Sequence, residues 1–290
     1  MAKARALDKR RRSVKSIRKI TRTMELISRA QFKRAMDRAS AATAYTRRIS
    51  DLVAHLAAAG MQVKHPLLTP HAQKKSAVLL VLTANRGLCG GYNSGVLRAG
   101  QAALNSLKEE WEEVRLEVSG KRGIANFKFR KIPTAQSYTH FNEKVRFEQV
   151  DVLAARYLDE YVAGSLDRLD VTYMKFESLS RQYPVVETLL PMGRMGDHST
   201  AVLGGPQYDF LPSAASILDE VVPAAFKAQL FKCFLDAAVS EQIARMVAMK
   251  AATENADAMI SLLSMSYNRA RQGQITGELL EIIGGAEAVQ

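Results

Sequence analysis

The stretch that decides the fold is Ala224–Gln272, AAFKAQLFKCFLDAAVSEQIARMVAMKAATENADAMISLLSMSYNRARQ, in which neither glycine nor proline occurs. At about 1.5 Å per residue, a single helix over this run is roughly 75 Å long. A compact domain built from the residues before it would be only roughly 40 Å across. The helix is therefore too long for its own domain, and another structure must cover its apolar side.

Apolar residues along this run recur at spacings built from three and four, the rhythm of a coiled coil. They are Leu235, Val239, Met246, Ala256, Ile260, Leu263, Tyr267 and Ala270. This seam predicts that a second helix packs against the first one.

The other end of the chain supplies that helix, because Met1–Ala59 also contains no glycine or proline. An apolar stripe with steps of three and four runs along it, formed by Val14, Ile17, Ile20, Met24 and Ile27. The two helices would lie beside one another, antiparallel or parallel, with the middle of the chain inserted between them. A basic disordered arm is the alternative, and the regular stripe argues against it.

The middle of the chain changes to a pattern of strands alternating with helices. The predicted elements are a buried strand at Ala77–Thr83, a helix at Ser94–Glu110, a strand at Val114–Val118, a turn at Gly120–Gly123, a helix at Phe147–Ser165, and an antiparallel pair at Val171–Glu177 and Val185–Leu190. This alternation predicts a small α/β domain with a partly parallel sheet.

Glycine, proline and the change of period divide the chain. We expect an N-terminal helix at 1–60, an α/β domain at 74–191, a loop at 192–212 and a C-terminal helix at 213–290. Ser213–Val222 approaches the long helix, and Pro223 stands near its beginning, where proline is tolerated.

Composition narrows the class of protein. The chain has 290 residues, 47% of them hydrophobic and 24% charged, which is typical of a soluble globular protein. No apolar run is long enough for a membrane span. Two cysteines provide no disulfide framework, and the five scattered histidines form no metal-binding motif. We expect no metal and no cofactor.

The net charge of +12 is concentrated at one end of the chain. Residues 1–48 contain 16 Lys and Arg but only three Asp and Glu, so this segment alone carries +13. Such a segment can face phosphates, an anionic membrane surface or an acidic protein, and charge alone does not choose among them.

The glycine-rich turn after the first strand, at 86–93, occupies the place where doubly wound domains bind nucleotides. It matches neither G-x-G-x-x-G nor G-x-x-x-x-G-K-[ST], so a tight strand-to-helix turn with Asn93 or Ser94 capping the helix explains it as well. No G-x-S-x-G sequence and no acid pair indicates catalysis. We expect no catalytic residue.

Two readings remain: a shaft with a globular head that acts through partners, and a basic coiled-coil protein that binds nucleic acid. The second would favour aromatic residues among the basic positions. Phe32 and Tyr45 are the only aromatic residues there, which favours the shaft.

Three blocks of sequence resemble the gamma subunit of rotary, F-type ATP synthases. The blocks are SIRKITRTME at 16–25, RGLCGGYN at 86–93, and SEQIARMVAMKAATENA at 240–256, which continues in YNRARQ at 267–272, Ile275-Thr276, Glu278-Leu279 and EIIGGA at 281–286. They lie at both ends and in the middle of the chain, so the resemblance extends to the whole architecture.

The resemblance implies an antiparallel coiled coil of the N- and C-terminal helices with an inserted Rossmann-like α/β domain. It also implies a non-catalytic rotor shaft that couples ion translocation to ATP synthesis or hydrolysis in the beta subunits. The implied partners are a hexamer of alpha and beta subunits, the epsilon subunit and the membrane c-ring. The implied location is peripheral, on the cytoplasmic side of a bacterial cell membrane, since we see neither a transit peptide nor a chloroplast-type regulatory loop.

Carried over residue by residue, the resemblance implies beta-subunit contacts at Met24, Arg245, Gln272, Thr276 and Glu278. It gives the turn residues a structural role, and these are Gly87, Gly90, Gly91 and Asn93. The chain departs from the family pattern in having Ile27-Ser28-Arg29-Ala30 and in having Asn85 where Asp is common.

Overall fold

The computed structural model describes residues 2–58, 65–71, 73–141, 145–192 and 214–287. It divides into two compact units. Residues 1–29 and 245–290 form one, which we call the two-helix unit, and residues 30–244 form the other, which we call the sheet unit. The predicted loop at 192–212 lies almost entirely outside the described residues.

Two long helices contribute to both units. Helix α1 spans Ala2–Ala58, as the absence of helix breakers predicts, and helix α5 spans Ala214–Glu287. The expectation that Pro223 stands near the start of the last helix is wrong, because α5 begins nine residues earlier and Pro223 lies inside it. Its neighbours Val222 and Phe226 are 0% exposed, and this burial offsets a proline cost of about 3 kcal/mol.

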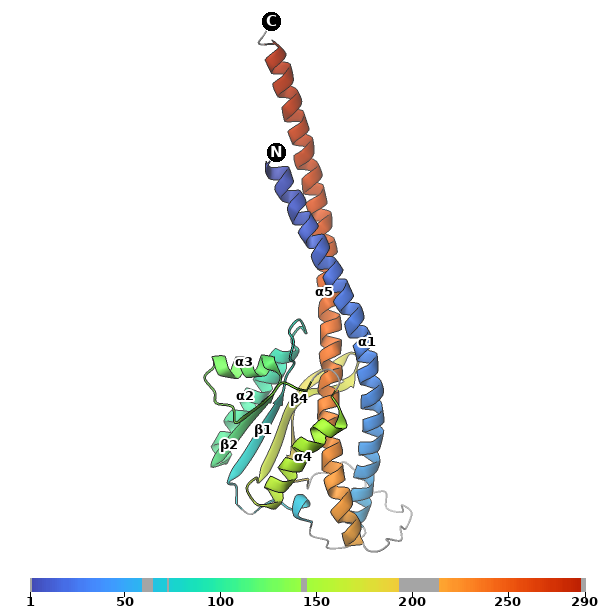
Figure 1. The fold of residues 1–290 in the computed structure, drawn as a ribbon, viewed down its shortest axis with the longest axis vertical. Coiled ribbons are helices and arrows are strands. Elements are labelled where there is room, and N and C mark those ends of the chain that lie inside the picture. The colour runs from blue at the N-terminus through green and yellow to red at the C-terminus, as the bar shows by residue number, and fades with distance from the viewer. Residues whose placement is uncertain (1, 59–64, 72, 142–144, 193–213, 288–290) are drawn as a thin grey trace. The chain divides into compact units, whose positions relative to one another are not determined.

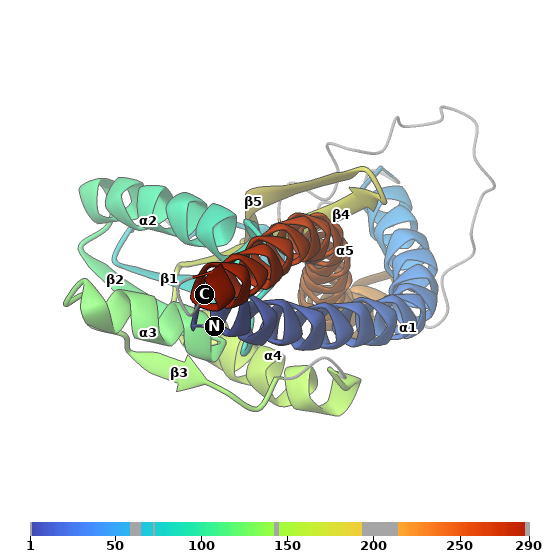
Figure 2. The ribbon, with the colours of Figure 1, turned by 90° about the horizontal axis from the view of Figure 1, so that it is seen from above.

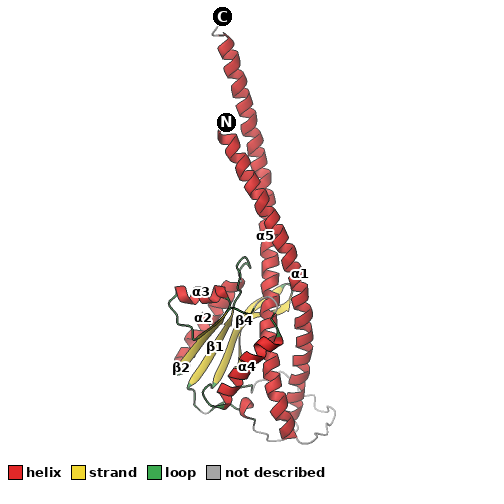
Figure 3. Cartoon of the chain, viewed as in Figure 1, coloured by secondary structure: helices red, strands yellow, loops and turns green. Residues whose placement is uncertain are grey.

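A five-stranded sheet forms the middle of the sheet unit, in the order β3-β2-β1-β4-β5. The strands are β1 (Ser76–Leu82), β2 (Glu113–Ser119), β3 (Gln136–Tyr138), β4 (Arg168–Ser178) and β5 (Arg181–Leu190). Strand β1 pairs in parallel with β2 and β4, β2 pairs in parallel with β3, and β4 pairs antiparallel with β5. Figure 3 shows that, among the described residues, all strands lie in this middle part of the chain.

Helices cover both faces of the sheet, and all seven residues of β1 are therefore buried. Ala77, Leu79 and Val81 pack in a cluster with helices α2 (Tyr92–Glu110) and α3 (Lys121–Phe129). The alternate residues of β1 pack in a second cluster with α4 (Phe147–Val162), the short helix η1 (Pro66–Leu68) and the first half of α5. The two layers can be followed in Figure 2. The predicted α/β fold is therefore confirmed.

Helix α1 packs against α5 within the sheet unit as well (Figure 1). Ala35 and Ala39 form a cluster with Leu235, Val239 and Ile243. Ala35 and Ala39 let the two helices approach closely, and the large buried side chains come from α5, while Phe32 and Met36 of α1 pack against the cluster partly buried. The first residues of the predicted α5 seam are thus buried here, with Leu235 at 2% and Val239 at 0% exposure.

The sequence pattern missed strand β3 and the short helix η1, and it missed helix α3, since Gly120–Gly123 was expected to be a turn. Only Gly120 lies outside the helix, with φ of 101°, and α3 begins at Lys121. A Cβ on Gly120 would overlap the backbone carbonyl of Thr83, and one on Gly123 would lie 2.8 Å from Val118 Cγ1. Close packing against β1 and β2 therefore requires both glycines, whatever the secondary structure around them.

We predict that Gly120→Ala lowers the free energy of unfolding by more than about 3 kcal/mol, because strain and a backbone overlap add. Gly164→Ala is the matched control, since Gly164 also has positive φ, 72°, but a Cβ there would meet no atom within 4 Å. It should cost only about 1–2 kcal/mol. Urea unfolding of both variants measures the difference, and equal losses would contradict the packing argument.

A cluster of charged groups lies where α5 crosses β4 and β5. Asp236 of α5 is 3% exposed, and burial raises the pKa of its carboxyl to about 6. The charge of Glu187 on β5 acts in the same direction, whereas Lys232 of α5 and Lys175 of β4 oppose it. Glu187 itself accepts hydrogen bonds from Tyr173 and Gln229, at 2.5 and 2.8 Å. The buried Asp236 charge is thus a cost to the fold at neutral pH.

We predict that Asp236→Asn is more stable than the parent at pH 8, and that this advantage is absent at pH 4. The folded pKa of about 6 exceeds the ordinary 3.8, so the parent's stability is fully present below about pH 4 and falls as pH rises through 6. The pKa shift corresponds to about 3 kcal/mol of unfolding free energy that the parent loses as the pH rises. The variant has no carboxyl at this position and should not show this loss. Chemical unfolding across this pH range is the measurement, with the exposed Asp37→Asn as control. A parallel pH dependence in parent and Asp236→Asn would refute the assignment.

Candidate partner-contact surface

The two-helix unit is held together by a narrow apolar seam. Val14 of α1 packs with Ala256 and Leu263 of α5, and all three are less than 10% exposed. Leu7 and Ile260 complete the cluster. Every residue of the predicted α5 seam is buried or half-buried, so that part of the pattern is confirmed.

Polar contacts across the seam fix the direction and register of the pair. Thr253 Oγ1 donates to Thr21 Oγ1 at 2.8 Å, and Arg18 Nε lies 2.5 Å from Asp257 Oδ1. Nearer the N-terminus, the Arg11 guanidinium lies 4.8 Å from the centre of the Tyr267 ring. Residue numbers fall along α1 as they rise along α5, so the helices are antiparallel. Sequence reasoning missed the Thr21–Thr253 pair because hydroxyls give no periodic apolar signal.

The predicted stripe on α1 is wrong as a seam. Val14 is buried, but Ile17, Ile20 and Ile27 are 52%, 59% and 51% exposed. After Val14, the buried positions of α1 in this unit are Thr21, Glu25 and Ser28, and Thr21 and Ser28 follow Val14 at successive steps of seven. A heptad of small and polar residues therefore faces α5, and the larger isoleucines face outward.

Exposed apolar side chains are concentrated on the two-helix unit. Of the 21 large apolar side chains that are exposed in the described residues, 13 belong to this unit. Four are on α1 and nine on α5: Ile17, Ile20, Leu26 and Ile27, then Val247, Met259, Leu262, Met265, Ile275, Leu279, Leu280, Ile282 and Ile283. Apolar surface on this scale marks a site that another molecule covers.

The C-terminal part of α5 extends past the start of α1 (Figure 1). Leu279, Leu280, Ile282 and Ile283 on it are 54–69% exposed. Exposed in water, these side chains contribute no stabilising free energy, whereas burying one such side chain contributes about 1.5–3 kcal/mol. This segment is therefore built for an external apolar contact.

The five predicted contact residues all belong to the two-helix unit. Gln272, Thr276 and Glu278 are exposed, and Glu278 accepts a hydrogen bond from Gln274 at 2.8 Å. Met24 is half-buried. Arg245 is only 4% exposed, which favours a role inside the chain over a direct partner contact. These assignments stay predictions.

The glycine-rich turn has a geometry of its own in the sheet unit. Gly90 has φ of 53°, and a Cβ on Gly87 would press into the Arg122 side chain. Asn93 does not cap α2, and neither does Ser94, because the helix begins at Tyr92 with Gly91 as its N-cap residue and no capping side chain. Asn93 Oδ1 instead accepts from Ala84 N at 2.9 Å and ties the end of β1 to α2.

Asn85, a departure from the family pattern, has a contact that an aspartate could not make. Its Nδ2 donates to Phe141 O at 2.8 Å and its Oδ1 accepts from Lys121 N at 3.1 Å. A carboxylate can only accept, so the amide suits this chain locally.

Neither a metal centre nor a membrane span is visible in the part of the chain that the structure describes. No three or more His, Cys, Asp or Glu side chains gather there as metal ligands would. None of the described helices combines the length and the apolarity needed to cross a bilayer.

The ATP synthase family matches residues 3–289. The ATP synthase gamma chain of Rhodopirellula baltica is 56% identical over 295 residues, with 100% of both chains covered. The chain belongs to the ATP synthase gamma chain family. The gamma chain of Leptospira biflexa is 37% identical over 289 residues, again with 100% of both covered.

Solved structures share the fold of this gamma-chain family member. A chain of the Euglena gracilis mitochondrial ATP synthase, OSCP/F1/c-ring in rotational state 3, has a TM-score of 0.66 and 18% identity, with 99% of this chain and 95% of that chain covered. A chain of the Euglena rotor has a TM-score of 0.62 at 18% identity, with 94% and 99% covered. At such identity the likeness shows the fold alone.

We predict that Ile20→Ser, on the outer surface, and Val14→Ser, in the seam, differ in their effect on stability. Ile20→Ser should change the stability of the isolated chain by less than about 0.5 kcal/mol, because the side chain is exposed. Val14→Ser should cost about 2 kcal/mol, because it removes buried apolar contact. Thermal unfolding followed by circular dichroism tests both values.

The effect of a substitution on assembly with partners should not follow its effect on the stability of the isolated chain. Ile20→Ser should weaken co-purification with alpha and beta subunits although the chain itself stays folded. An Ile20→Ser variant that is destabilised alone, or that assembles like the parent, would count against an outward-facing contact.

Proposed function

We propose that this chain is the central rotor shaft of the catalytic head of an ATP synthase. In this role it couples ion translocation through a membrane c-ring to ATP synthesis or hydrolysis by beta subunits. The observation that carries the proposal is the gamma chain of Rhodopirellula baltica, which is 56% identical over the whole of both chains. The similar solved chains belong to assemblies described as a rotor and as OSCP/F1/c-ring.

The proposed shaft needs no active site of its own. Its rotation presents different faces to three catalytic beta subunits in turn, and each face favours a different conformation of the subunit it meets. The two-helix unit has unlike faces, since exposed isoleucines on α1 alternate with basic side chains such as Lys15 and Lys19. The nucleic-acid alternative has no support from the relatives, which are gamma chains.

A shaft must also resist torque. Helix α5 is continuous for 74 residues, and between Ala224 and Gln272 it contains neither glycine nor proline. Continuous hydrogen bonding along a paired helix is stiff, whereas a proline within this 224–272 run would introduce a kink. The stiffness follows directly from the sequence feature that made the helix too long for its own domain.

The proposal extends to partners and place. The exposed apolar segment at the end of α5 would lie inside a hexamer of alpha and beta subunits, with Gln272, Thr276 and Glu278 among its contacts. Met24 and Arg245 would act lower on the shaft, Arg245 through its buried position. The epsilon subunit and the c-ring would contact the opposite end. We place the protein peripherally on the cytoplasmic side of a bacterial membrane.

We predict that Ile260→Pro uncouples or disassembles the complex. Proline here removes a backbone hydrogen bond in the middle of α5 and costs about 3 kcal/mol or more. ATP hydrolysis and ATP-driven ion pumping should be measured together on purified complex. Ile260→Ala, which keeps the helix, serves as control and should retain coupling.

Two outcomes would sink the proposal. One is an Ile260→Pro complex that still pumps ions in proportion to hydrolysis. The other is failure of the parent chain to co-purify with alpha and beta subunits while it binds DNA with steep salt dependence.

A further inference from the structure

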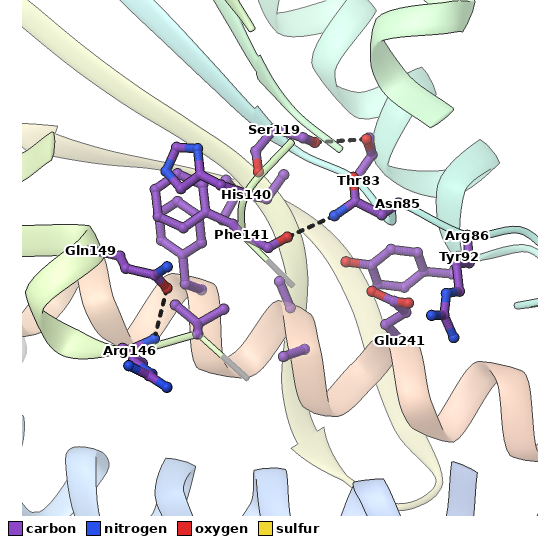
Figure 4. Close-up of a pocket in the computed structure, with 15 residues that line it drawn as sticks. Thr83, Asn85, Arg86, Tyr92, Ser119, His140, Phe141, Arg146, Gln149 and Glu241 are labelled. Atoms are coloured by element: carbon purple, nitrogen blue, oxygen red, sulfur yellow. Dashed lines mark hydrogen bonds between the residues drawn. The ribbon is translucent and has the colours of Figure 1, made fainter. Parts of the chain in front are cut away.

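The sheet unit contains a cavity of about 620 Å³ that the shaft function does not use. It lies at the carboxyl ends of β1 and β2, between the N-terminus of α4 and the side of α5 (Figure 4). Doubly wound sheets bind their ligands at this edge, next to the strand where the order of the sheet reverses. Here that strand is β1, because the chain moves outward to β2 and β3 and then returns to β4 on the other side.

Several polar groups around the cavity are already used within the fold. Thr83 Oγ1 donates to Ser119 O at 2.8 Å and accepts from Gly123 N at 2.9 Å. Asn85 holds the loop at Phe141. Figure 4 shows Glu241 near Arg86 and Tyr92, at the end of the cavity away from α4. These three side chains keep contacts of their own within the chain.

The Ser119 hydroxyl is different. Ser119 is only 4% exposed and lines the cavity, yet within the described residues its Oγ makes no hydrogen bond. The hydroxyl therefore opens into the cavity without a protein partner among the described residues. A ligand in the cavity would supply that partner.

The α4 end of the cavity is suited to an anion. Arg146 is the N-cap residue of this 16-residue helix, and its side chain is exposed and lines the cavity. Gln149 accepts from Arg146 N and thereby orients the first turn (Figure 4). A guanidinium beside a helix N-terminus is a strong arrangement for a phosphoryl group, and here the Gln149 backbone amide is already used, since it donates to Arg146 O at 3.2 Å. His140 adds a further ring nitrogen on the same rim.

We propose that this cavity binds a small organic phosphate, with its phosphoryl group held by Arg146 and the N-terminus of α4. The organic part fills the remaining volume and gives the Ser119 hydroxyl a hydrogen-bond partner. The volume supports an organic phosphate over inorganic phosphate, since pockets of about 300–1,000 Å³ hold ligands of drug size. The phosphate is held at α4, not at the glycine-rich turn, so the missing nucleotide motifs do not count against it.

Isothermal titration of the full chain with AMP, ATP, ribose 5-phosphate and inorganic phosphate tests the proposal. We expect saturable one-to-one binding of at least one organic phosphate, and weaker binding of inorganic phosphate. Arg146→Ala should weaken binding at least 10-fold, because it removes a charge-assisted bond. Ser119→Ala should weaken it about 3- to 10-fold, because it removes one neutral hydrogen bond.

Arg98→Ala, an exposed arginine of α2 outside the cavity, is the matched control and should bind like the parent. Circular dichroism shows whether each variant is folded. Ala238→Leu, which places a larger side chain in the cavity wall, should abolish binding and gives a second route if one variant fails to fold.

Three results would overturn the proposal: no saturable binding of any probe at millimolar concentration, equal weakening by Arg98→Ala, or inorganic phosphate binding as tightly as every organic phosphate. The titration uses the chain without its partners, so its failure leaves the rotor function untouched.

Discussion

A helix that carries apolar side chains on several sides must be covered on several sides, and α5 meets this constraint in two ways. Within the sheet unit, eight consecutive residues, Cys233–Ser240, are all buried, because sheet, α4 and α1 surround the helix. In the two-helix unit, α1 covers only a stripe centred on Ala256 and Leu263. The remaining apolar side chains there stay exposed until a partner surrounds them, so the covering of α5 links the fold to the assembly.

The seam shows what periodicity predicts and where it fails. The α5 positions were predictable because their large apolar residues have no polar competitor at heptad spacing. On α1 two faces compete. Val14, Ile17, Ile20, Met24 and Ile27 follow steps of three and four, whereas the true seam continues from Val14 through Thr21, Glu25 and Ser28. Apolar pattern alone assigns the larger residues to the seam. Close helix approach and an external partner reverse that assignment, and neither is encoded in the spacing of one helix.

The sheet unit was predictable where burial is continuous. Strand β1 is apolar from Ala77 to Leu82 and proved central, and the β4–β5 pair was indicated by its short connection. Helix α3 and the continuation of α5 through Pro223 were not predictable, because Gly120, Gly123 and Pro223 mark the ends of elements only where no distant contact constrains them. Thr83 and the buried core around Phe226 impose those constraints. The cavity at Ser119 was equally hidden, since it is formed by loops and helices far apart in sequence.

The glycines at the end of α5 are the clearest indication that a partner surrounds this segment. Gly273, Gly277, Gly284 and Gly285 lie inside a continuous helix, where each costs about 1 kcal/mol relative to alanine. A Cβ on any of them would meet no atom of the described chain within 4 Å, so internal packing does not require them. Glycine that costs stability and relieves no internal contact needs an external reason. A surrounding surface that passes close to the helix backbone on every side supplies one, and it leaves the smallest side chains where a turning shaft needs the most clearance.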